Sequence, residues 1–148
     1  MAIAALILWL ATIGAGWSLL AIWLVEYDRT FHETAATRLP IPVMGVHALC
    51  ALGGLAAWIG YLLGGTQRLA LTATAILGVV AVLCFIMVTR WIGVWRAYRA
   101  RSAALNDPGG VVIIDVPPER HLPVTLVILH GVLAVATVIL VLLAALHA

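Results

Sequence analysis

The chain has 148 residues, of which 65% are hydrophobic and only 9% are charged, and its formal net charge is +2. A soluble domain of this size needs a much larger charged surface, so the composition excludes a water-soluble protein and makes lipid the solvent for most of the chain. The small net charge indicates no particular partner, and nucleic acid is not an expected partner in a membrane setting.

Four apolar runs cover residues 3–25, 41–64, 69–88 and 124–146. Each is close to the length of about 20 residues that crosses a hydrocarbon core as a helix. The sequence therefore predicts an all-α integral membrane protein, with a single domain over residues 1–148 that is a bundle of four transmembrane helices. The expected helices cover residues 3–25, 41–64, 69–104 and 123–146, with a connecting loop at 105–122.

The first apolar run differs from a cleaved secretory signal. No basic residue precedes it, it is longer than a typical signal core, and Trp9, Trp17 and Trp23 interrupt it. We expect it to be retained as the first transmembrane helix. The two cysteines, Cys50 and Cys84, lie in the second and third runs without the spacing of a metal cluster or a disulfide framework, and we expect them to be small buried packing residues.

The third helix is expected to continue beyond the membrane. Residues 89–105 mix arginines with Trp91, Trp95 and Tyr98, a combination that suits an anionic lipid surface. The turn-forming residues 106–110 then end the helix. Residues 111–115 are mostly β-branched and bounded by helix breakers, and they favour a short extended strand.

The arginines predict the orientation, because the chain contains no lysine. The two longer segments between the apolar runs, residues 26–40 and 89–123, hold every arginine except Arg68. Basic residues concentrate on the cytoplasmic side of membrane proteins. This distribution predicts a multi-pass protein of the plasma or inner membrane, with both loops in the cytoplasm and both termini outside. The arginines on the loop side are Arg29, Arg38, Arg90, Arg96, Arg99, Arg101 and Arg120.

A short phrase occurs twice in the chain. Leu39-Pro40 is followed after six residues by His47, and Leu122-Pro123 is followed after six residues by His130. Both histidines belong to helices that start on the cytoplasmic side, so each is expected about 10 Å into the membrane from that face. The repetition suggests two related helical hairpins, although the similarity outside the phrase is slight and leaves a true duplication open.

The histidine pair is the strongest candidate for a functional site, because an ionisable residue inside a membrane is by default a hypothesis about function. Two imidazoles from facing helices can hold one iron. Small neighbours would give a porphyrin room, and arginines just upstream would pair with its propionates. The candidate residues are His47 and His130 as iron ligands, Ala51, Gly131 and Ala134 as the small neighbours, and Arg38 and Arg120 as the propionate partners.

With these features the chain resembles the small membrane b-type cytochromes, four-helix proteins that hold haem b between histidines on facing helices. The resemblance covers the four-helix plan together with His47 and His130. It implies a haem b cofactor and electron transfer with a quinol or a protein partner near the cytoplasmic side, rather than an enzyme acting by itself. Many members carry two haems and four such histidines, whereas this sequence offers one intramembrane pair.

Two other functions compete with electron transfer. The chain has no other catalytic motif, which favours an accessory or structural subunit of a larger membrane complex, with the two histidines as hydrogen-bonding residues between helices. The remaining alternative is a small metal or proton transporter, acting as a homo-oligomer. It would need polar residues along a path, and the first and third helices offer few beyond Thr12, Ser18, Thr72 and Thr74.

Overall fold

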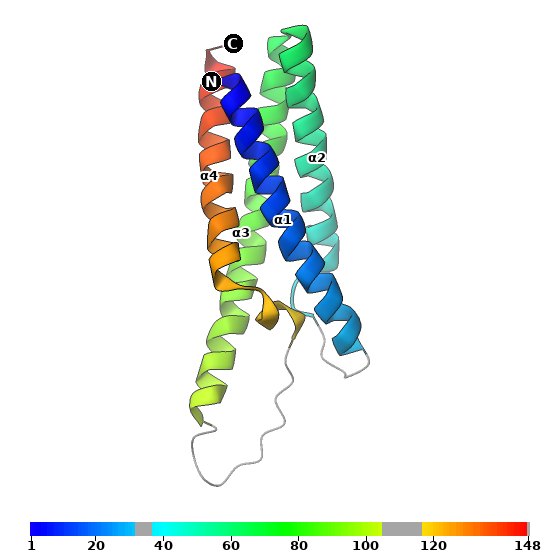
Figure 1. The fold of residues 1–148 in the computed structure, drawn as a ribbon, viewed down its shortest axis with the longest axis vertical. Coiled ribbons are helices and arrows are strands. Elements are labelled where there is room, and N and C mark those ends of the chain that lie inside the picture. The colour runs from blue at the N-terminus through cyan, green and yellow to red at the C-terminus, as the bar shows by residue number, and fades with distance from the viewer. Residues whose placement is uncertain (32–36, 105–116, 148) are drawn as a thin grey trace.

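The computed structural model describes residues 1–31, 37–104 and 117–147, and these residues form an all-helical bundle (Figure 1). Within them, four helices are long and apolar enough to cross a membrane, so the predicted fold class is confirmed. The elements are α1 (Ala2–Phe31), α2 (Ile41–Gly64), α3 (Gln67–Ala104), the short 3₁₀ helix η1 (Pro118–His121) and α4 (Val124–Leu146).

Proline and glycine set the ends of the central helices. Pro40 precedes α2 with an extended backbone, and Pro123 does the same before α4. At the other end of α2, Gly65 has a φ of 64°, and its N–H donates to the carbonyl of Tyr61 at 2.8 Å. This left-handed conformation is easily adopted by glycine and strained for other residues. It lets α3 start at Gln67 and run back antiparallel to α2.

The four helices pack as two pairs. α2 packs mainly on α3, and α1 packs mainly on α4, whereas α1 with α2 and α3 with α4 touch much less. We call the thinner boundary between the α1/α4 pair and the α2/α3 pair the seam. The consecutive hairpins suggested by the repeated phrase are therefore not the closely packed units.

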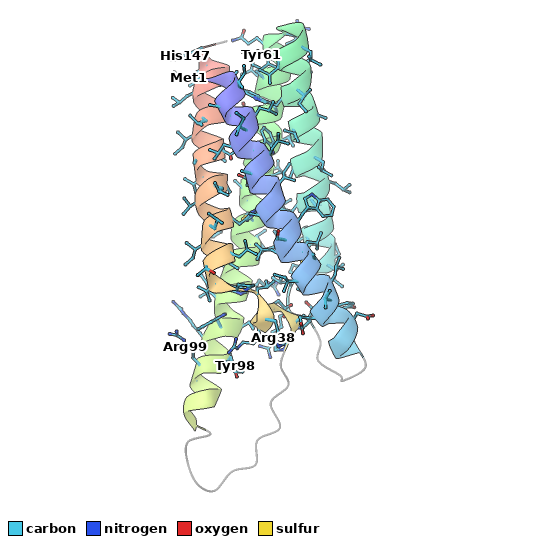
Figure 2. All side chains as sticks on the ribbon, viewed as in Figure 1. Met1, Arg38, Tyr61, Tyr98, Arg99 and His147 are labelled. Atoms are coloured by element: carbon cyan, nitrogen blue, oxygen red, sulfur yellow. The ribbon has the colours of Figure 1, made fainter. Side chains whose placement is uncertain are left out.

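The bundle has two chemically different ends. The N- and C-termini lie together beside the turn between α2 and α3 (Figure 1), and we call this the terminal end. The opposite end, where α2 and α4 begin, is called the loop end. Met1, Tyr61 and His147 mark the terminal end, and Arg38, Tyr98 and Arg99 lie at the loop end (Figure 2).

Two clusters of buried apolar side chains hold the helices together. The terminal cluster is built around Trp9 and Trp58, with alanines that let the helices approach. Gly54 is part of this packing, since a Cβ atom added there would lie 3.0 Å from Cζ2 of Trp9. The loop-end cluster consists of Trp23, Leu39 and Leu122, with Met44 and Val127 packed against it.

The end of α1 and the burial of the two cysteines differ from the sequence predictions. α1 continues to Phe31, past the apolar run that ends at residue 25. Cys50 and Cys84 are free thiols, but both are half-buried rather than buried. The strand predicted over residues 111–115 lies outside the described residues.

Candidate functional site

His47 and His130 face each other across the seam. The centroids of the two imidazole rings are 6.4 Å apart, and the ring planes meet at 67°. The two rings lie between the two apolar clusters. Met44 and Val127, which come before the histidines in the sequence, pack against the loop-end cluster. Cys50 and Val138, which come after them, pack against the terminal cluster. The repeated spacing from Pro40 and Pro123 thus brings the two rings together in the bundle.

Each histidine is oriented by a backbone carbonyl of its own helix pair. Nδ1 of His47 lies 3.2 Å from the carbonyl oxygen of Val80 on α3, and Nδ1 of His130 lies 3.0 Å from the carbonyl oxygen of Thr12 on α1. A carbonyl oxygen only accepts, so in both rings Nδ1 carries the proton and donates it. In a neutral imidazole, Nε2 then keeps its lone pair for a ligand.

The two contacts are alike in their place in the fold, because each joins a histidine on a helix that begins at the loop end to a carbonyl on the other helix of the same pair. His47 on α2 bonds to Val80 on α3, and His130 on α4 bonds to Thr12 on α1. Val80 and Thr12 are also buried to the same degree, with exposures of 8% and 9%. The two histidines therefore have similar surroundings as well as the same spacing from a proline.

A pair of buried threonines supports the position of His130. The hydroxyl oxygens of Thr12 on α1 and Thr137 on α4 lie 2.9 Å apart, and both side chains are buried. This hydrogen bond fixes the register of α1 against α4, and the carbonyl of the same Thr12 accepts from His130. Thr137 was not predicted from the sequence, although its position seven residues after His130 places both residues on one face of the helix.

Gly16 makes room for the ring of His130. A Cβ atom added at Gly16 would lie 3.0 Å from Cε1 of His130, so the ring rests against the backbone of α1. We expect Gly16→Ala to displace the ring, weaken its bond to Thr12 and cost about 1–3 kcal/mol of stability. The measurement is the thermal unfolding midpoint of the purified protein in detergent.

Gly14 provides the matched control, because a Cβ atom added there meets nothing within 4 Å. Gly14→Ala should leave the unfolding midpoint unchanged or raise it slightly, since alanine is the better helix former. Equal midpoints for the Gly16→Ala and Gly14→Ala proteins would show that the contact between Gly16 and His130 does not constrain the bundle.

The small residues predicted around the pair lie in different environments. Ala51 is half-buried and packs against the terminal cluster, and Ala134 is also half-buried on α4. Gly131 instead borders an open groove of about 360 Å³ along α4, and a Cβ atom added there meets nothing within 4 Å. Gly131 is nevertheless half-buried, as Ala51 and Ala134 are.

The two arginines predicted as propionate partners, Arg38 and Arg120, lie at the loop end. The loop-end cluster separates them from the histidines along the bundle. The guanidinium carbon of Arg120 is 3.9 Å from the ring centroid of Tyr98 and 5.3 Å from that of Trp95, so cation–π contacts hold it on α3. The backbone N–H of Arg38 donates to Oε1 of Glu119 at 2.7 Å. No contact between either arginine side chain and the histidine rings occurs among the described residues.

Glu119 is a structural residue that sequence analysis did not identify. Its side chain is fully buried, and its Oε1 accepts from the N–H groups of Arg38 and Leu39 and from the hydroxyl of Thr37. Residues 37–39 lead directly into α2, and Glu119 belongs to the short helix just before α4. We call this set of bonds the Glu119 clasp. It ties together the starts of the two helices that carry the histidines.

The sequence matches no protein-family model, and neither a curated protein nor a solved structure matches it. The function of this multi-pass membrane protein is therefore argued from its own residues.

Proposed function

We propose that His47 and His130 are the two axial ligands of one haem b, and that the protein is a membrane electron carrier. Its electron partner would be a quinol or a protein at the loop end. The observation that carries the proposal is the geometry of the pair: rings 6.4 Å apart on facing helices, each with Nδ1 bonded to a carbonyl. With Nδ1 protonated in each ring, both Nε2 atoms keep a lone pair that can bind a metal.

The distance between the rings suits a shared metal. A metal–imidazole bond of about 2.0 Å and a ring centroid about 1 Å behind Nε2 place the two centroids about 6 Å apart. The observed separation of 6.4 Å is close to that value. A metal-binding histidine usually donates its other ring N–H to a backbone carbonyl or a carboxylate, because this hydrogen bond fixes the tautomer and the ring orientation.

The number of ligands favours haem over a bare metal ion. In the part of the chain that the structure describes, no group of three or more histidine, cysteine, aspartate or glutamate side chains is placed to hold a metal. Zinc sites in proteins normally use three or four protein ligands. A porphyrin supplies four nitrogen ligands of its own and asks the protein for only two.

The proposal places the haem at the seam between the two helix pairs. His47 belongs to the α2/α3 pair and His130 to the α1/α4 pair, so the two ligands approach the seam from opposite sides. The seam is where the bundle is packed least extensively, and separating the two pairs there leaves both close pairs intact. Cofactor sites in helical bundles are typically built from side chains on facing helices in this way.

A haem titration tests the binding step of the proposal. We expect the purified protein, freed of cofactor in a mild detergent, to bind added haemin with saturation at one haem per chain. The resulting oxidised spectrum should be that of six-coordinate, low-spin iron. A spectrum that changes linearly with haemin, as it does with empty micelles, would contradict a defined site.

An accessory subunit of a larger complex is the second candidate, and one observation favours it. Both Nδ1 atoms already donate to carbonyls of neighbouring helices, so the histidines can stabilise the bundle without any cofactor. In that case His47→Ala and His130→Ala should lower the unfolding midpoint equally in the presence and absence of haemin. Under the haem proposal, haemin raises the midpoint of the wild-type protein and has no such effect on the variants.

The orientation belongs to the same proposal, because an electron partner in the cytoplasm requires the loop end to face it. Arg38, Arg96 and Arg120 lie at the loop end, whereas Arg68 lies at the terminal end. We expect a cysteine at Thr66 to react with a membrane-impermeant maleimide on intact cells, in a chain without the native cysteines. A cysteine at His121, which is 44% exposed, should react only after lysis. The opposite pattern would reverse the orientation.

A further inference from the structure

Buried polar atoms without a partner gather at the loop end. Among the described residues, five side-chain atoms are buried and have no hydrogen-bond partner, and four of the five are N–H donors. A buried donor without a partner is costly, because it has lost its hydrogen bond to water. The loop end therefore lacks hydrogen-bond acceptors for four buried N–H groups. The five atoms are Nε1 of Trp23, Trp91 and Trp95, Nε of Arg120 and Oε2 of Glu119.

Two of the residues that carry these donors, Trp91 and Trp95, line a groove where α3 passes the start of α4. Its volume is about 270 Å³, and we call it the α3/α4 groove. Arg99 projects from α3 below the start of α4 (Figure 2), with its guanidinium carbon 4.6 Å from the centroid of the Trp95 ring. The groove is lined by Trp91, Ile92, Trp95, Arg96, Arg99 and Val124.

The charge around the groove is positive and unneutralised. Arg96 and Arg99 are exposed on α3, and Arg120 packs on the adjoining Trp95 and Tyr98 rings. Within the described residues, no carboxylate forms an ion pair with these three arginines. An anionic group in the groove would therefore meet the exposed cations of Arg96 and Arg99, next to the buried N–H groups of Trp91 and Trp95.

We propose that the α3/α4 groove binds the phosphate headgroup of one anionic phospholipid. Trp91 and Trp95 lie towards the end of the span that runs from Gln67 to Ala100, at the level where aromatic side chains meet the headgroup layer. Towards the middle of the bundle, Phe85 on α3 and Ile128 on α4 are exposed and offer an apolar surface to the acyl chains. The site does not depend on haem, because no groove residue contacts the histidine pair.

Thermal unfolding with added lipid tests the site. Delipidated full-length protein in a neutral detergent should unfold at a higher temperature when dioleoyl phosphatidylglycerol is added, with saturation as binding completes. The double variant Arg96→Gln with Arg99→Gln should bind this lipid roughly thirty-fold more weakly, because each arginine near a lipid surface contributes about 1 kcal/mol. Both side chains are exposed, so the fold should persist, and circular dichroism checks it.

Arg68 is the matched control, since it is an exposed arginine at the other end of the same helix. Arg68→Gln should keep the full response to phosphatidylglycerol. Trp95→Phe keeps an aromatic ring, although a smaller one, and removes the N–H donor, and it should weaken the response several-fold. An equal response in the double variant, or an equal response of the wild type to dioleoyl phosphatidylcholine, would overturn the site. An equal response to inorganic phosphate would show that the groove selects an ion and not a lipid.

Discussion

Replacement of either His47 or His130 by alanine is expected to abolish the low-spin haem spectrum of the protein. One remaining imidazole leaves the iron five-coordinate or lets the haem dissociate, because the other axial position then has no protein ligand. We expect the purified variants to contain less than about a tenth of the wild-type haem, or to show the shifted Soret band of high-spin iron, since a lost ligand bond is worth well over the 1.4 kcal/mol that changes binding tenfold. The measurement is the absorption spectrum normalised to protein.

His121 and His147 are the controls for this result, since both are exposed and lie at the ends of the bundle. His121→Ala removes only the 3.5 Å contact with Glu26 at the loop end, and His147→Ala changes the end of α4. Both variants should keep the wild-type spectrum. His47→Met is a conservative test, because methionine can serve as an axial ligand and raises the reduction potential. An unchanged haem spectrum in both the His47→Ala and the His130→Ala protein would show that other residues bind the haem.

Glu119→Ala is expected to lower the free energy of unfolding by about 3 kcal/mol, since it leaves three donors without their acceptor and a hydrogen bond contributes about 1 kcal/mol net. The substitution removes the acceptor of the Arg38 and Leu39 N–H groups, at 2.7 and 2.8 Å, and of the Thr37 hydroxyl. The measurement is reversible unfolding of the protein in mixed micelles with increasing denaturing detergent.

Glu119→Gln changes the carboxyl group to an amide and keeps the length of the side chain. The glutamine carbonyl can still accept from the same three donors, so this variant should lose less stability than Glu119→Ala. A second expectation follows from the position of the clasp before α2 and α4, whose starts it ties together. Glu119→Ala should weaken haemin binding as well as stability. A variant as stable as the wild type would show that the clasp is not needed to hold the loop end.

The fold was predictable because lipid imposes a simple rule on the sequence. A run of about 20 apolar residues must form a helix in order to satisfy its backbone, so four runs predict four helices. The meeting of His47 and His130 was predictable for a similar reason, since equal spacing from Pro40 and Pro123 on parallel helices sets equal depths. Both predictions rest on distances along the chain.

Other features depend on packing that the sequence does not reveal. The pairing of α1 with α4 and of α2 with α3 depends on which helix faces fit, and all four helices are apolar on most sides. The partners of the histidines are backbone carbonyls, which every residue has and which therefore leave no signal in the sequence. Glu119 stood in the sequence as one acidic residue in a loop, and only folding brings it to the N–H groups of Arg38 and Leu39.

The absorption spectrum of the wild-type protein tests the central claim most directly. The protein should be purified in mild detergent from cells that make ample haem, and its spectrum recorded oxidised and after reduction with dithionite. The haem proposal predicts a Soret band that sharpens and shifts on reduction, with well-resolved α and β bands of bis-histidine haem b, at one haem per chain. A colourless protein that also fails to bind added haemin would contradict the proposal and favour the accessory-subunit function.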